Sequence, residues 1–98
     1  MDTNEAQELM RKIYLKCDKE QGLERTLLRT FQELGELSDA VLQKRTRKEI
    51  SDEIGDIFAW LCSIANLLEI DISDALMKKY PGVCYRCNKA PCECIETP

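Results

Sequence analysis

The sequence predicts an all-α fold, an up-and-down four-helix bundle, on three observations. Apolar residues recur at three- and four-residue spacing in four successive segments, which is the period of an amphipathic helix. No segment shows the alternation of apolar and polar residues that is typical of a strand. The links between the segments are short, as between antiparallel neighbours in a bundle. The stripes of the second and third segments are expected to face the core and include Leu27, Leu28, Phe31, Leu34, Ile54 and Phe58.

The first two helices are predicted from stop and start signals. We expect the first helix over about residues 4–17, with Asn4 and Gln7 as a capping box. The polar segment 18–22 is expected to end it, because it interrupts the apolar stripe and closes on a glycine. The second helix should then cover about residues 23–43.

The last two helices have clear N-terminal signals. Thr46 heads a capping box, so a third helix is expected to begin there and to run to about residue 68. Asp71 indicates a further helix start, and the fourth helix should cover residues 72–80 until Pro81 stops it.

Length and charge limit the classes of partner. The chain has 98 residues, which suits one helical domain over residues 1–80 and a short cysteine-rich extension over residues 81–98. So small a chain is expected to gain stability as a homodimer or homotetramer. A net charge of −4 argues against a nucleic acid polymer as partner. The longest nearly apolar run, residues 57–68, is too short to cross a membrane, and the polar start is no signal peptide, so we expect a cytoplasmic protein.

Two four-residue words of the same type carry the chemistry. Glu33 and Glu36 enclose an aliphatic residue and a glycine, and Glu53 and Asp56 do the same twenty positions later. Acids three apart share one face of a helix, so neighbouring helices can direct four carboxylates at one point. Such a group needs a cation, and all-oxygen ligands favour Mg²⁺ or Mn²⁺. The alternative is that these acids belong to the solvated faces of a highly charged protein.

The glycines inside the two words add a packing expectation. Gly35 and Gly55 each cost a helix about 1 kcal/mol relative to alanine. Their matched places predict that the backbones of the second and third helices approach closely there. Such an approach would bring the two pairs of acids within reach of shared metal ions.

The arrangement resembles the all-α NTP pyrophosphohydrolases of the MazG-like family. That family carries E-E-x-x-E on one helix and E-x-x-D on the next, and the similarity here covers about residues 5–80. The resemblance implies that Mg²⁺ is held by Glu33, Glu36, Glu53 and Asp56. The first acid of the longer motif is Gln32 in this chain, which puts the rate in doubt more than metal binding.

The resemblance also implies a reaction, the hydrolysis of an NTP or dNTP to the monophosphate and pyrophosphate. The chain has no histidine, so a metal-activated water is the natural nucleophile, with Glu36 or Glu53 as the acceptor of its proton. Four further residues are candidate substrate contacts: Lys78, Lys79, Trp60 and Asn66. Their alternatives are solvated lysines at a helix end, packing of the indole, and hydrogen bonding of the amide to backbone.

The extension carries a second signal, Cys84-x-x-Cys87 followed by Cys92-x-Cys94. Four thiolates can complete a structural Zn²⁺ site, although the second pair is tighter than the usual zinc spacing. The alternatives are a flexible reduced segment and disulfides.

Two further functions stay open beside an enzyme. A family relative that has lost turnover would act as a nucleotide-binding or partner-binding module, and Gln32 is the feature that favours it. A purely structural helical oligomer would have no need of the matched acidic words.

Overall fold

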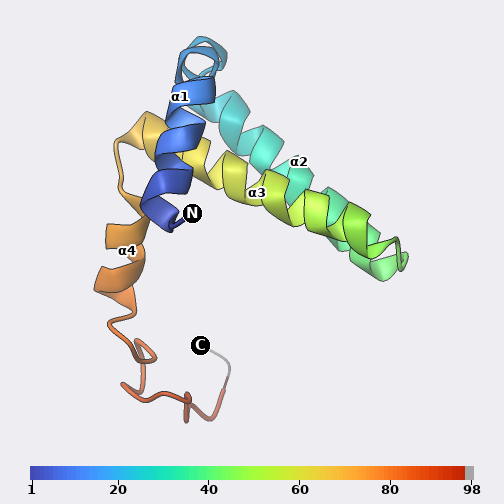
Figure 1. The fold of residues 1–98 in the computed structure, drawn as a ribbon. Helices are drawn as coiled ribbons and strands as arrows, with labels where there is room; N and C mark the ends of the chain where they lie inside the picture. The colour runs from blue at the N-terminus through green and yellow to red at the C-terminus, as the bar shows by residue number, and fades with distance from the viewer. Residues whose placement is uncertain (97–98) are drawn as a thin grey trace.

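The computed structural model describes residues 1–96 as four helices joined by short turns (Figure 1). They are α1 (Thr3–Gln21), α2 (Leu23–Leu42), α3 (Arg47–Leu68) and α4 (Ile72–Lys79). No strand occurs in these residues, so the predicted all-α class is confirmed. None of the described helices combines the length and the apolar character that crossing a membrane requires.

Side-chain caps begin the last two helices at the predicted residues, although the cap at Thr46 has one bond of the expected capping box and not both. The Thr46 hydroxyl accepts from the backbone N–H of the third residue of α3 at 3.2 Å, and an Asp71 carboxylate oxygen accepts from that of α4 at 2.8 Å. The expected ends of α2, α3 and α4 agree with the structure to within one residue.

The first helix differs from its prediction at both ends. Its capping box is formed by Asp2 and Glu5, whose side chains each accept from the other's backbone N–H, and not by Asn4 and Gln7. The helix also continues through the polar residues that were expected to end it. Polar side chains do not break a helix, whereas Gly22, at φ 92°, does, and its N–H closes the last turn on the Asp18 carbonyl at 2.8 Å.

The four helices do not close into the predicted bundle within one chain. In Figure 1, α2 and α3 lie side by side as an antiparallel pair and α1 crosses them near the C-terminal half of α3. The short α4 packs mainly on α1 and leads away from the α2–α3 pair into the extension. One side of the α2–α3 pair is therefore left without a covering helix in the part of the chain described.

The predicted core stripes are largely exposed, which corrects the expectation from the sequence. Among the described residues, the buried apolar side chains are Ala40, Cys62 and Ala65. Large side chains of the stripes lie open instead, Phe31 by 75% and Leu28 by 61%. We call the open apolar stripe on α2 and α3 the exposed apolar face; its members are Leu27, Leu28, Phe31, Leu34, Val41, Ile54, Phe58 and Leu61.

The expected close approach of backbones at the glycines is also wrong. A Cβ built on Gly35 or Gly55 would meet no described atom within 4 Å, apart from the backbone of its own turn. The backbones of α2 and α3 are therefore not brought together by these residues, and the acids meet through the reach of their side chains.

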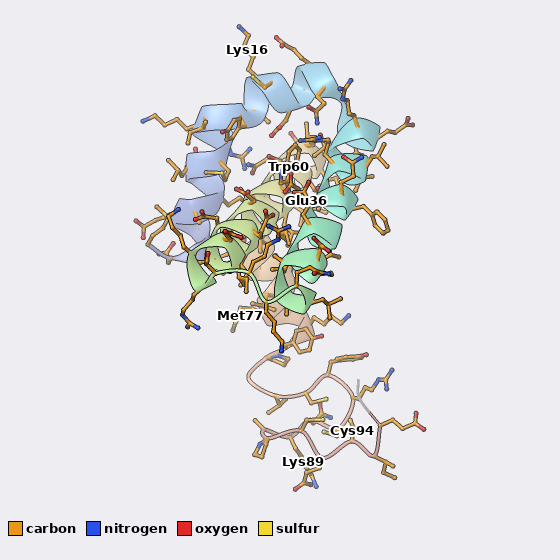
Figure 2. The ribbon with its side chains drawn as sticks, turned by 90° about the vertical axis from the view of Figure 1, so that its right-hand side faces the viewer. Lys16, Glu36, Trp60, Met77, Lys89 and Cys94 are labelled. Atoms are coloured by element: carbon orange, nitrogen blue, oxygen red, sulfur yellow. The ribbon has the colours of Figure 1, made fainter. Side chains whose placement is uncertain are left out.

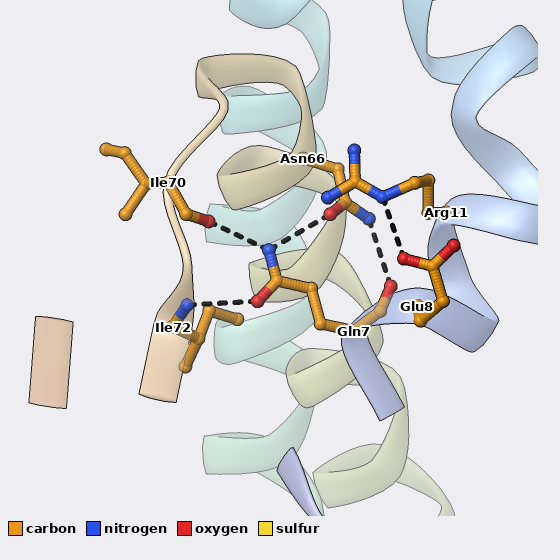
Figure 3. Close-up of polar contacts among 6 residues, drawn as sticks. All are labelled: Gln7, Glu8, Arg11, Asn66, Ile70 and Ile72. Atoms are coloured by element: carbon orange, nitrogen blue, oxygen red, sulfur yellow. Dashed lines mark hydrogen bonds and ion pairs between the residues drawn. The ribbon is translucent and has the colours of Figure 1, made fainter. Parts of the chain in front are cut away.

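A buried polar network fixes α1 against α3 (Figure 3). The Gln7 side-chain amide donates to the Asn66 side chain at 3.0 Å and to the Ile70 carbonyl at 2.8 Å, and its oxygen accepts from the Ile72 N–H at 2.9 Å. The Asn66 amide donates back to the Gln7 carbonyl at 3.3 Å. Because buried amides are costly unless paired, this network holds α1 in one position along α3 and fixes the start of α4.

Candidate functional site

Three of the four predicted metal ligands converge between α2 and α3. Glu33 from α2 and Glu53 and Asp56 from α3 each offer a carboxylate oxygen, and these oxygens all lie within 4.8 Å of one another. The spacing follows from the helices, because Glu53 and Asp56 are three apart on one face of α3. We call these residues the three-acid group.

Glu36, the fourth predicted ligand, stands beside this group. It lines an adjoining cavity together with Glu53. Glu36 is exposed, one turn further along α2. Its carboxyl is therefore in reach of the three-acid group without being part of it.

The electrostatics of the group are those of crowded carboxylates. Desolvation, and then the neighbouring carboxyl group of Glu36, raise the pKa of Glu33, whose side chain is 13% exposed. Desolvation, with the charges of Glu36 and Asp56, raises the pKa of Glu53. The Glu53 Oε2 atom is buried and finds no hydrogen-bond partner among the described residues. A divalent cation would satisfy this oxygen and offset the repulsion, and all-oxygen ligands suit Mg²⁺ or Mn²⁺.

A cavity of about 300 Å³ opens beside the three-acid group, between α1 and α3. The α3 wall includes Asp56 and, one turn further on, Trp60, and the α1 wall includes Tyr14, Asp18 and Gln21. We call it the Trp60 cavity. Of the predicted substrate contacts, Trp60 is the one that lies next to the acids, because it lines this cavity together with Asp56 (Figure 2).

Arg29 ties the cavity to the acids. Its guanidinium lies 3.9 Å from a Glu33 carboxylate oxygen and 5.7 Å from the centre of the Trp60 ring. A cation over an indole face is attracted by the ring, so Arg29 restrains Trp60 while it partly compensates Glu33.

A second cavity, of about 470 Å³, lies on the other side of the three-acid group. Gln32 and Glu36 line it from α2, Glu53 lines it from α3, and Arg45 reaches it from the turn between the helices. Gln32, the departure from the family motif, is thus placed at the site itself.

The other predicted substrate contacts lie elsewhere in the chain. Lys78 pairs with Asp74 at 2.8 Å, and the Lys79 ammonium lies 4.8 Å from the centre of the Tyr85 ring; both lysines are on α4. Asn66 is 2% exposed and its amide is engaged in the network with α1, so the geometry favours the alternative role of hydrogen bonding to backbone.

Sequence reasoning missed the contribution of α1 to the Trp60 cavity. Tyr14 and Asp18 are four apart and therefore share a face of α1, which is a signal that could have paired them. The sequence hides this pairing because Asp18 stands in the polar segment that is expected to end the helix.

The four cysteines of the extension form a separate cluster. Their sulfur atoms all lie within 4.8 Å of one another, and Figure 2 shows Cys94 at the far end of the molecule from Glu36 and Trp60. All four are free thiols in the structure. The Cys84 and Cys94 sulfurs are 3.8 Å apart, and those of Cys87 and Cys92 are 4.0 Å apart.

Backbone amides and neighbouring thiols perturb the cysteines in opposite directions. The N–H groups of Cys87 and then Arg86 lower the pKa of Cys84 to about 6. The Cys92 thiol, followed by desolvation, raises the pKa of Cys94 to about 12. The Glu93 N–H donates to the Cys87 sulfur at 3.4 Å. N–H donors directed at sulfur stabilise thiolates, which are the form that binds metal.

Comparison with known proteins identifies one family. The family model for the MazG nucleotide pyrophosphohydrolase domain matches residues 21–87, which include α2, α3, α4 and the first cysteine pair. The matched segment begins at the last residue of α1, so Tyr14 and Asp18 lie outside it. Neither the curated proteins nor the solved structures give a significant match.

Proposed function

The chain belongs to the MazG nucleotide pyrophosphohydrolase family, and we propose that it hydrolyses a nucleoside triphosphate, NTP or dNTP, to the monophosphate and pyrophosphate with Mg²⁺ or Mn²⁺. Family membership suggests nucleotide pyrophosphohydrolase activity in general. The observation that carries the finer proposal is the three-acid group, with its unpartnered Glu53 oxygen, beside a cavity that holds an indole.

The acidic residues and Arg45 have separate proposed roles in hydrolysis. Glu33, Glu53 and Asp56, joined by Glu36, would hold the metal, which when bound supplies positive charge to phosphate oxygens and lowers the pKa of a coordinated water. Both candidates line the second cavity, and Glu36 is the better placed to take the proton of the attacking water, because Glu36 is exposed whereas the Glu53 Oε2 atom is buried. Arg45, in the same cavity, offers a positive charge to phosphate oxygens.

Gln32 supports one alternative, a catalytically weak or inactive relative that binds a nucleotide or a partner. It lines the second cavity with Glu36 and Glu53, where a carboxamide cannot act as a base. Nucleotide binding with Mg²⁺ but without pyrophosphate release would favour this alternative.

We further propose that the exposed apolar face is covered by a second copy of the chain. A contiguous apolar surface of this kind is rare on a monomer. It lies on α2 and α3, and a homodimer, or a homotetramer of paired dimers, would bury it.

For the extension we propose a structural Zn²⁺ site made by Cys84, Cys87, Cys92 and Cys94. A tetrahedral site with Zn–S bonds of about 2.3 Å has sulfur–sulfur edges of about 3.8 Å. The two pairs at 3.8 and 4.0 Å are close to that edge length. Four thiolates leave no open position, so the zinc would order the extension and take no part in hydrolysis.

Hydrolysis is tested by incubating the protein with each NTP and dNTP plus Mg²⁺ and measuring pyrophosphate. Glu53→Gln should abolish turnover, because it removes a charged ligand, while the helical circular dichroism signal is retained. Glu8→Gln is the matched control, since Glu8 lies on α1 and pairs with Arg11. Turnover by Glu53→Gln would show that the ligand assignment is wrong, and no product across the panel would refute the hydrolase.

A further inference from the structure

Asp18 is the buried acidic residue that the proposed chemistry leaves unexplained. It is 6% exposed, and its Oδ2 atom has no hydrogen-bond partner in residues 1–96. Burying a carboxylate costs several kcal/mol unless it is paired. Asp18 is not among the acids that converge within 4.8 Å, so the metal cluster does not account for it.

The fold holds Asp18 in the wall of the Trp60 cavity. Its carbonyl accepts from the Gly22 N–H, which ends α1, and the buried network around Gln7 fixes the other end of that helix. The cavity that Asp18 lines also contains Trp60 and the metal-ligand candidate Asp56. A planar group stacked on the indole would therefore lie in a cavity whose wall includes Asp18.

We propose that Asp18 determines specificity in this cavity by accepting a hydrogen bond from an N–H donor on the edge of the substrate's nucleobase. The inference rests on the proposed function and deepens it. An ionised carboxylate can only accept, so it selects bases that present an amino group: adenine, cytosine and guanine. Uracil and thymine flank their one ring N–H with two carbonyl oxygens, which the carboxylate repels.

The components of the cavity match the parts of a nucleoside triphosphate. Trp60 offers a face on which any base can stack, and Arg29 restrains that ring from the side of the acids. Stacking alone is tolerant of the base, so selectivity has to come from a polar group at the base edge. Asp18 is the buried polar group of the cavity with an unused acceptor. It comes from α1, outside the segment that matches the family.

The first test uses pairs of substrates that differ in one amino group, CTP with UTP and ATP with ITP. The wild type should prefer the amino-bearing member of whichever pair it turns over by at least about tenfold in kcat/KM, which is about 1.4 kcal/mol. Asp18→Asn should remove that preference or shift it toward the carbonyl-bearing member, because a carboxamide can donate to a carbonyl. Glu8→Gln should leave the ratio unchanged. Equal kcat/KM values in the wild type, or a ratio that Asp18→Asn does not alter, would overturn the inference.

A second test separates this inference from the proposed hydrolysis. Trp60 is the only tryptophan, so its fluorescence reports directly on the cavity. Titration without metal uses CMP with UMP and AMP with IMP. The amino-bearing member of at least one pair should quench Trp60 at lower concentrations, and Asp18→Asn should abolish the difference. If the nucleotides quench Trp60 differently but no triphosphate is hydrolysed, the proposed hydrolysis is refuted and the role of Asp18 in specificity stands. If triphosphates are hydrolysed but the nucleotides quench Trp60 equally, the hydrolysis stands and the role of Asp18 is refuted. Asp18→Ser serves if Asp18→Asn does not fold.

Discussion

Phe31 offers the sharpest test of how the exposed apolar face is used. Its side chain is 75% exposed in the single chain, on the same face of α2 as Leu27, Leu28 and Leu34. Phe31→Ala removes most of the apolar surface of this one side chain, and it does not lower the helix propensity of the position. The single chain should therefore fold as before, and the change should be felt where two copies meet.

The size of the effect follows from the burial. Fully burying a phenylalanine side chain stabilises by about 1.5–3 kcal/mol, so covering the open three-quarters would contribute about 1–2 kcal/mol. A twofold interface contains the residue twice, which doubles the loss to about 2–4 kcal/mol. The dimer dissociation constant should rise by a factor of about 30 to 1,000.

Sedimentation velocity over a concentration series measures this constant. The Phe31→Ala protein should dissociate at concentrations where the wild type stays dimeric, with an unchanged helical circular dichroism signal. Lys16→Ala, an exposed polar position on α1, is the control and should sediment like the wild type. A monomeric wild type at every concentration, or an unchanged constant in the variant, would refute a second copy as the cover of this face.

Three further predictions follow from the described geometry. Purified protein should contain about one Zn²⁺ per chain by metal analysis, and Cys87→Ser should lose it while Cys17→Ser, outside the cluster, keeps it; a zinc-free wild type would contradict the site. The raised pKa values of Glu33 and Glu53 mean that the metal-free folded state binds more protons than the unfolded state, so its Tm should rise as the pH falls from about 7 to about 5. The gain in Tm from added Mg²⁺ should be larger at pH 7 than at pH 5. An equal gain at both pH values would contradict this prediction. Gly55→Ala should raise the free energy of unfolding by about 1 kcal/mol and Tm by about 4–8 °C, because its Cβ meets open space, and a lower Tm would show that an assembled partner occupies that space.

Local patterns in the sequence predicted what depends on local geometry. The helix starts at Thr46 and Asp71 follow from side chains that cap their own first turn. The pairing of Glu53 with Asp56 follows from helical spacing alone. The acids of the two motifs lie close together because α2 and α3 are joined by a short turn, which makes the two helices neighbours.

The misses concern contacts between elements that no local pattern encodes. Apolar stripes say that a face is to be covered, yet they do not say whether the cover comes from the same chain. Phe31 was therefore assigned to a core that the described residues do not form. The matched positions of Gly35 and Gly55 predict a packing role, whereas the space around both residues is open.

Arg29 shows why the site is a single unit and why that unity was hard to predict. On α2, Arg29 and Glu33 are four apart and share a face, and on α3, Asp56 and Trp60 do the same. The Arg29 guanidinium connects the two pairs, because it lies 5.7 Å from the Trp60 ring centre and also pairs with Glu33. Each half is visible as an i, i+4 pair, whereas the contact between the halves exists only once α2 and α3 pack in this register. A nucleotide whose phosphates bind at the acids would therefore have its base directed to the Trp60 cavity. Asp18 lines this cavity and has a carboxylate oxygen without a hydrogen-bond partner among the described residues.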